Sequence, residues 1–436
     1  MQSSFKEFIP TYQPSQAIFE ASRCIECYDA PCVKGCPVGI DIPRFIARIK
    51  MKDFIGANQI VKEKCILPAI CGRVCPVEKL CVKNCCVTEP IGPVQINHLQ
   101  RFVADYELEH ESITSLHPKQ NNKKVAVIGS GPAGLATAAE LAKIGYKVDV
   151  FESGEHPGGM MTYCLPSYRL PRKIVEAELD SVKRLGIEIK TNTPIKDKEL
   201  LTKGYDAIFV GTGTPEPVCM GIPGENMKGV FQGINFLRQI STATRRKKDL
   251  PQIAGKQVAV VGGGDVAIDV AISAVQLGAK RTHLLYRRSF EEMPANPSGV
   301  SEAKEHGVMF WILTDPKRII GDAQGRVKAV ECIEMKLGKP DKSGRRSPIP
   351  IPGTEFKLPV EVVIEACGQK PNDELIKTLE LKTASDGTIK VDKNGESSRK
   401  GVFAGGDVTN GGATVVQAIA EGVRAAIGID KSLGKT

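Results

Sequence analysis

The stretch KKVAVIGSGPAGLATAAELAKIGYKVDVFE, residues 123–152, specifies the architecture of much of the chain. An apolar strand runs into a glycine-rich turn, a helix of small residues follows, and a second strand ends in an acid. In such units the glycines allow a tight turn, close approach of a pyrophosphate and close helix–strand packing, while the acid hydrogen-bonds a ribose 2′-hydroxyl. The stretch therefore predicts a dinucleotide-binding βαβ unit, and its binding residues are Gly129, Gly131, Pro132, Ala133, Gly134 and Glu152.

A second copy of this pattern, KQVAVVGGGDVAIDVAISAVQLGAKRTHLLYRRS, occupies residues 256–289. Its last strand ends in Arg287 and Arg288 instead of an acid. Two guanidinium groups at that place can bind the 2′-phosphate of NADP(H), whereas the carboxylate of the first copy repels one. NADP(H) is therefore favoured over NAD(H) for the second unit, with solvated surface arginines as the alternative.

A third segment, GVFAGGDVTNGGATVVQAIAEGVRAA, spans residues 401–426. It reads as a short strand that ends in Gly405, Gly406 and Asp407, followed by a helix of small residues. This segment resembles the motif of flavoproteins with two dinucleotide domains, in which the aspartate binds the ribityl chain of FAD. The resemblance assigns FAD to the first unit and NADP(H) to the second, which is inserted between the two parts of the FAD domain.

The cysteines are concentrated near the amino end. Of the 14 cysteines, 10 lie between Cys24 and Cys86, in or near the runs CIECYDAPCVKGCP (24–37) and CGRVCPVEKLCVKNCC (71–86). The spacing is compatible with a disulfide knot, a zinc site or iron–sulfur clusters. The run C-x2-C-x4-C-x3-C-P is close to the ferredoxin run C-x2-C-x2-C-x3-C-P, whereas zinc requires no proline at a fixed place. Iron is therefore favoured over zinc.

Composition and the first residues limit the remaining possibilities. The segment MQSSFKEFIP has no basic start followed by an apolar core, so the expected location is cytoplasmic, where disulfides are rare. No apolar run approaches the roughly 20 residues of a membrane helix. The formal charge of +9 comes without a nucleic-acid-binding motif, so neither a nucleic acid nor a membrane partner is expected. Residues 110–124 are polar and aperiodic and read as a linker.

Nearly the full chain resembles the small subunit of glutamate synthase and the pyridine-nucleotide half, or separate bacterial subunit, of dihydropyrimidine dehydrogenase. The motifs that carry the resemblance are ASRCIECYDAPCVKGCP, CGRVCPVEKLC, GPVQINHLQRF, GSGPAG, LPSYRLP, GGGDVAIDVA, YRRSFEEMPA and FAGGDVTNGG. The segment EEMPANPSG departs from the pyrimidine branch, because it lacks a further basic residue near the expected phosphate site.

The resemblance implies two 4Fe-4S clusters with separate ligands. One cluster takes Cys24, Cys27, Cys32 and Cys85. The other takes Cys36, Cys75, Cys81 and Gln100, because the pyrimidine branch uses a glutamine in place of a fourth thiolate. Cys65, Cys71 and Cys86 are then spare.

The same resemblance implies the remaining cofactor contacts. Arg169 contacts the flavin nucleotide, and Asp407, Gly406 and Thr414 lie at its ribityl and phosphate side. The NADP(H) site takes Gly262, Gly264, Asp265, Val266, Ala366 and Gly368, in addition to Arg287 and Arg288.

The fold expected from these segments is α/β, with an NAD(P)H domain inserted in an FAD domain, both Rossmann-like, preceded by a helical iron–sulfur domain. The expected boundaries are 1–118 for the iron–sulfur domain, 119–215 with 365–436 for the FAD domain, and 216–364 for the NAD(P)H domain.

The expected activity is electron input, from NADPH to FAD and then singly through the clusters to a separate catalytic subunit. NADPH delivers two electrons and a cluster accepts one, so a flavin must stand between them. No catalytic acid, base or nucleophile is predicted. A bifurcating NAD(P)H–ferredoxin oxidoreductase, with ferredoxin as partner, and a sulfur or sulfide oxidoreductase subunit are the alternatives.

Two other classes are weighed against this activity. A thioredoxin reductase-like disulfide reductase is disfavoured because residues 216–364 contain only Cys219 and Cys332. A non-catalytic iron–sulfur redox module needs no NADPH turnover.

Overall fold

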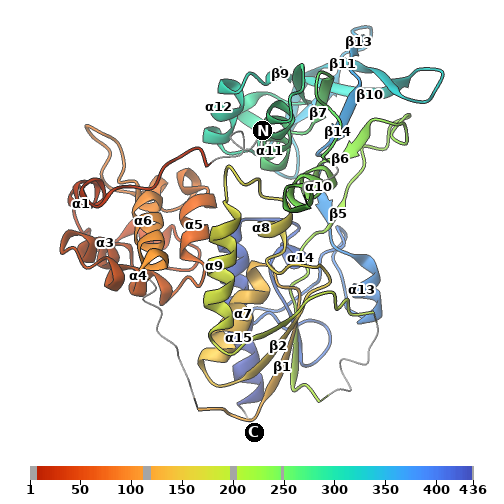
Figure 1. Cartoon of the computed structure of the whole chain (residues 1–436). Helices are drawn as coiled ribbons and strands as arrows, with labels where there is room; N and C mark the ends of the chain where they lie inside the picture. Colours follow the sequence, from red (N-terminus) through yellow and green to blue (C-terminus); the bar gives the residue numbers. More distant parts are fainter. Residues whose placement is uncertain (1–6, 111–118, 197–203, 247–249, 435–436) are drawn as a thin grey trace. The chain divides into compact units, whose positions relative to one another are not determined.

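The computed structural model describes residues 7–110, 119–196, 204–246 and 250–434 (Figure 1). The chain forms two compact units. One unit contains Tyr163–Pro166 and the described residues of Glu216–Gln369, and the other contains the described residues of Lys6–Thr162, Ser167–Pro215 and Lys370–Thr436. Most of the expected linker, residues 111–118, lies outside the described residues.

The amino-terminal part of the larger unit is helical. Residues 42–50 and 54–62 form two helices, each of which follows an aspartate. Asp41 accepts a hydrogen bond from Arg44 N, and Asp53 accepts one from Gly56 N, so each carboxylate satisfies an amide that the helix itself leaves unpaired. The helices are α1 (Pro14–Ser22), α2 (Pro31–Lys34), α3 (Ile42–Lys50), α4 (Phe54–Lys62), α5 (Pro68–Val74) and α6 (Ile96–Glu109), with the 3-10 turns η1 (Val77–Lys79) and η2 (Val82–Asn84).

The rest of the larger unit is built on a parallel sheet with the order β16-β4-β1-β2-β3. Helices α7 and α15 pack against each other so closely that a Cβ on Gly422 would lie 2.3 Å from the carbonyl oxygen of Ala133. The strands are β1 (Lys124–Ile128), β2 (Lys147–Phe151), β3 (Glu188–Lys190), β4 (Ala207–Val210) and β16 (Val402–Ala404), and the helices are α7 (Pro132–Lys143), α8 (Met160–Tyr163), α9 (Arg172–Lys183), α13 (Asp373–Thr378), α14 (Asp407–Asn410) and α15 (Val415–Leu433).

The smaller unit repeats this architecture, with a parallel sheet in the order β6-β14-β7-β8-β9 and a smaller antiparallel sheet formed by β10, β11, β12 and β13. Its strands are β6 (Val230–Gln232), β7 (Gln257–Val261), β8 (Arg281–Tyr286), β9 (Met309–Ile312), β10 (Thr314–Gly321), β11 (Val327–Pro340), β12 (Arg346–Pro350), β13 (Phe356–Pro359) and β14 (Val362–Glu365). Its helices are α10 (Gly233–Arg246), α11 (Asp265–Gln276) and α12 (Pro297–Glu305), with the turn η4 (Phe290–Glu292), and the short strands β5 (Glu216–Pro217) and β15 (Gln369–Lys370) pair separately.

The predicted α/β class, with two dinucleotide-binding sheets and a helical amino-terminal part, is confirmed. Strand β16 joins β4 from a distant part of the chain, so the sheet that begins at residue 124 is completed by residues 402–404. The predicted domain boundaries stay predictions.

Candidate functional site

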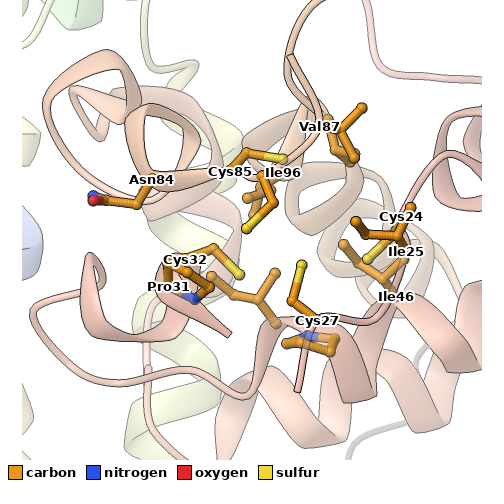
Figure 2. Close-up of a pocket in the computed structure, with 14 residues that line it drawn as sticks. Cys24, Ile25, Cys27, Pro31, Cys32, Ile46, Asn84, Cys85, Val87 and Ile96 are labelled. Carbon is orange, nitrogen blue, oxygen red and sulfur yellow. The ribbon is translucent and has the colours of Figure 1, made fainter. Parts of the chain in front are cut away.

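The first group of thiols lines a pocket in the helical part of the larger unit. Figure 2 shows the side chains of Cys24, Cys27, Cys32 and Cys85 around one space, with Ile46 and Ile96 among the apolar residues that close it. These four cysteines are the residues predicted to hold one cluster. Cys86, which is predicted to be spare, also lines this pocket.

The protonation of these thiols reflects their crowding. Burial, and then the neighbouring Cys24, raise the pKa of the Cys32 thiol to about 11. Burial also raises the pKa of Cys24, although Lys50 works in the opposite direction. Several thiolates placed so close together repel one another in the absence of a cation. The donor set therefore fits a soft, positively charged iron cluster, which binds cysteine as thiolate.

A second group of thiols lies around helix α5. Cys71 is buried on this helix, and its thiol is hydrogen-bonded to the thiols of Cys65 and Cys75, which raises its pKa well above the usual range. Burial, and then Cys75 and Cys36, raise the pKa of Cys81 to about 12. The structure thus brings together the three cysteines predicted for the other cluster, which are Cys36, Cys75 and Cys81. Cys65 and Cys71 belong to the same group.

Gln100 projects from α6, which packs against α5. Its side chain is buried, and its Nε2 donates a hydrogen bond to the carbonyl oxygen of Pro68, 3.0 Å away. Its role as a ligand stays a prediction, and Cys65 and Cys71 are competing donors for the same cluster. The C-x3-C spacing to Cys75 could have identified Cys71 from the sequence as a candidate ligand, whereas no such spacing identifies Cys65.

The first glycine loop has the geometry that a dinucleotide needs. Gly129 follows β1 with φ +98°, and a Cβ there would lie 2.6 Å from Gly211 O, so a side chain is excluded. Helix α7 begins directly after Gly131 and has no side-chain cap in the described part of the chain. Its first N–H groups, near Ala133 and Gly134, can therefore bind phosphate oxygens.

Glu152 lies at the end of β2, beside this loop. It is buried, and its carboxylate accepts hydrogen bonds from Ser130 N at 3.1 Å, Ser130 Oγ at 2.5 Å and Gly154 N at 2.7 Å. These donors fix the position of the carboxylate next to the loop. A carboxylate held in this way fits the predicted ribose contact.

The carboxy-terminal motif lies at the end of β16. Gly406 has φ +80°, and its amide donates to Glu421 on α15. Burial raises the pKa of Asp407, although its Oδ1 accepts a hydrogen bond from Ala413 N at 3.0 Å. Thr414 caps α15 through its Oγ1, so it acts in the local structure as well as in the predicted flavin contact.

The second glycine loop has the same geometry in the smaller unit. Gly262 has φ +145°, and a Cβ there would lie 2.3 Å from Ala366 O. A Cβ on Gly264 would meet no atom within 4 Å, so this residue faces open space before α11. Asp265, the first residue of α11, is exposed and accepts a hydrogen bond from Asn296 N.

The two arginines that follow β8 differ in their surroundings. Arg288 is buried, with its NH2 2.6 Å from Asp341 Oδ2 and its Nε donating to Arg346 O. Arg287 is exposed. The sequence predicts an equivalent pair, whereas the structure engages Arg288 with the antiparallel sheet and presents Arg287 to solvent.

Three further predicted contacts lie on connecting segments. Ala366 N donates to Val261 O, so the chain after β14 follows the second glycine loop closely. Gly368 has φ +131°, and its carbonyl accepts a hydrogen bond from Val218 N. Arg169 is half-buried, and its guanidinium lies 5.6 Å from the ring centre of Tyr168. The roles of these residues in cofactor binding stay predictions.

Two family models match the chain. The pyridine nucleotide-disulphide oxidoreductase model matches residues 123–422, and the model of dihydropyrimidine dehydrogenase domain II, 4Fe-4S cluster, matches residues 1–112. The two matches fall on the glycine loops and on the thiol groups, respectively. Among the described residues, no helix is sufficiently long and apolar to span a membrane.

Curated relatives agree with both matches. The chain is 40% identical to NADP(+)-dependent formate dehydrogenase subunit beta of Moorella thermoacetica over 93% of its own length and 60% of that protein. It is 39% identical to NADPH-Fe(3+) oxidoreductase subunit beta of Geobacter sulfurreducens over 93% of its length and 64% of that protein. It therefore spans less than two thirds of these relatives. It is 34% identical to the glutamate synthase [NADPH] small chain of Escherichia coli over 97% of its length and 93% of that protein.

Solved structures show the same fold at lower identity. FprA of Mycobacterium tuberculosis in complex with NADPH is 18% identical, with a TM-score of 0.62 over 73% of this chain and 85% of that one. Thioredoxin reductase of T. acidophilum is 19% identical, with a TM-score of 0.55 over 72% of this chain and 100% of that one. The chain therefore belongs to the glutamate synthase small-chain-like family, and it is an FAD-dependent NAD(P)H oxidoreductase with an iron–sulfur domain.

Proposed function

We propose that the chain is the electron-input subunit of a larger enzyme. It receives a hydride from NADPH and releases single electrons, through two 4Fe-4S clusters, to a separate catalytic subunit of the dihydropyrimidine dehydrogenase or glutamate synthase type. A bound flavin exchanges electrons in pairs or singly, which joins hydride transfer to one-electron clusters.

One observation carries this proposal: the thiol-bearing helices and the first nucleotide-binding sheet belong to one packed unit. Helix α5 contacts α9 (Figure 1). Ala69 N, in the first turn of α5, donates to Glu178 Oε1 on α9 at a distance of 2.6 Å. Cys71 lies on the same short helix α5, two residues further along. Electron transfer between the two cofactor sites would therefore cross a direct contact and need no motion of the domains.

The residues of the chain then have distinct tasks. The uncapped starts of α7 and α11 bind the pyrophosphates, Glu152 holds a ribose, and Arg287 is the exposed candidate for the 2′-phosphate. Arg288 supports this strand end through Asp341. Orientation of the two rings, not acid–base chemistry, is the main demand of hydride transfer.

The partner follows from the relatives by analogy. Two of them are named as beta subunits, of a formate dehydrogenase and of an Fe(3+) oxidoreductase, so we infer that this chain also works with another subunit. Ferredoxin is the second candidate for the electron acceptor, with or without bifurcation. Clusters held by the thiol groups would release single electrons, which ferredoxin can accept equally well.

The test is anaerobic reduction of the purified protein by NADPH. Flavin absorbance in the visible range should bleach within seconds, and both clusters should then give electron paramagnetic resonance signals. Cys85→Ser should lose the signal of one cluster and keep the bleaching, while Cys86→Ser, the neighbouring control, should keep both. Protein that is colourless and free of inorganic sulfide, or that NADPH does not bleach, would contradict the proposal.

A further inference from the structure

A second kind of ligand cluster lies in the smaller unit and includes none of the amino-terminal thiols. Cys219, Glu225 and Glu365 each place one ligand atom within 4.8 Å of the others. Glu365 is the last residue of β14, and the other two lie on the segment that leads from β5 to β6. The cluster is thus at the carboxyl edge of the parallel sheet.

Glu365 has an unusual environment for a carboxylate. Its side chain is only 2% exposed, and its Oε2 accepts a hydrogen bond from Gln232 Nε2 at 2.8 Å. Its Oε1 is buried without a hydrogen-bond partner, and so is Oε1 of Gln232. Gln232 Nε2 also lies 3.6 Å from Cys219 Sγ, so the amide group belongs to the same cluster. A buried carboxylate oxygen without a donor is costly, so this oxygen of Glu365 is available to bind a cation.

The charges of the two glutamates also favour a bound cation. Burial, and then the negative charge of Glu225, raise the pKa of Glu365, although hydrogen bonds from Gln232 and from the Met220 amide partly offset this rise. Within the described part of the chain, neither carboxylate forms an ion pair with a lysine, an arginine or a histidine. The two carboxylates therefore lie close together, although the formal charge of the chain is +9.

The donor atoms select the kind of cation. A thiol and two carboxylates form a mixed sulfur–oxygen set, whereas Ca²⁺ and Mg²⁺ take oxygen ligands alone. Zn²⁺ binds sulfur at about 2.3 Å and oxygen at about 2.0–2.2 Å, so its ligands stand roughly 3.5 Å apart. The ligand atoms lie within 4.8 Å of one another, so they need to approach by at most about 1.3 Å, which rotations of the exposed Cys219 and of Glu225 can provide.

We propose that Cys219, Glu225 and Glu365 form a Zn²⁺ site in the NAD(P)H domain. Binding replaces the thiol proton of Cys219 by a Zn–S bond and releases the proton to solvent, with no change of oxidation state. The site is separate from the two groups of cysteines near the amino end.

The experiment measures protection of one thiol in the intact, cluster-loaded protein. Under argon, the protein is treated with iodoacetamide with and without ZnCl₂, and alkylation of each cysteine is followed by peptide mass spectrometry. Zn²⁺ should slow the alkylation of Cys219 at least tenfold. Cys367 is also exposed and lies outside the cluster, so its rate should not change. MgCl₂ should protect neither thiol.

Variants connect the protection to the carboxylates. Glu365→Gln should abolish the protection of Cys219, and Glu225→Gln, which changes the other carboxylate, should weaken it and supplies the test if the first variant does not fold. Glu355→Gln changes an exposed carboxylate of the same domain and should leave the protection intact. Equal alkylation of Cys219 with and without Zn²⁺, or full protection in both cluster variants, would overturn the proposal. Flavin bleaching by NADPH without added metal is measured in parallel, so a failure of the electron-input function is recognised separately.

Discussion

Glu178 carries the most quantitative prediction. This carboxyl is 2% exposed, and burial raises its pKa to about 8 from an ordinary value of 4.5. The folded chain therefore holds the proton more tightly than the unfolded chain does, and the associated stability is complete below about pH 4.5 and lost as the pH rises to about 8. A pKa difference of one between the folded and unfolded chain corresponds to about 1.4 kcal/mol, so the full loss is about 5 kcal/mol.

The substitution Glu178→Gln removes this proton. The amide oxygen can still accept the hydrogen bond from Ala69 N, so the contact between α5 and α9 is kept. From pH 6 to pH 9, wild type should lose roughly 2.5 kcal/mol of its free energy of unfolding through this carboxyl, and the variant should not. The difference in free energy of unfolding between variant and wild type should therefore grow by the same amount.

The assay is unfolding by guanidinium under argon at pH 6 and pH 9, followed by circular dichroism. Glu176→Gln, an exposed carboxyl two residues earlier on α9, is the matched control and should follow wild type. If Glu178→Gln and wild type lost stability in parallel between the two pH values, the buried carboxyl would not be protonated as the structure implies, and the reasoning would be refuted.

The remaining predictions concern the cofactors. Gln100→Ala should remove or alter the electron paramagnetic signal of one cluster; unchanged iron content and unchanged signals would show that a cysteine is the ligand instead. Arg287→Ala should raise the KM for NADPH at least tenfold and that for NADH less than twofold in steady-state kinetics. Equal changes in the two KM values would contradict the predicted contact of Arg287 with the 2′-phosphate. Arg288→Ala should instead lower the melting temperature, because it removes the ion pair with Asp341 and the hydrogen bond to Arg346 O; an unchanged melting temperature would contradict this. Gly262→Ala should abolish NADPH oxidation without loss of FAD, because the added Cβ meets a backbone oxygen; normal turnover would argue against that clash.

The fold class and the positions of the two nucleotide loops could be predicted from the residues alone. Gly129 and Gly262 adopt positive φ in the turn of a strand–turn–helix unit, and a short stretch of residues encodes that unit. The clustering of ten cysteines near one end likewise marks the iron–sulfur part in the amino-acid sequence.

Which side chains meet could not be predicted in this way, because it depends on how the chain packs. Packing buries Arg288 against Asp341 and Arg346, whereas Arg287 stays exposed. It also joins Glu365 to Cys219, which lies on a different strand connection. These outcomes depend on contacts between residues distant in sequence, and burial of a charged or polar group is a property of the packed chain that no local pattern encodes.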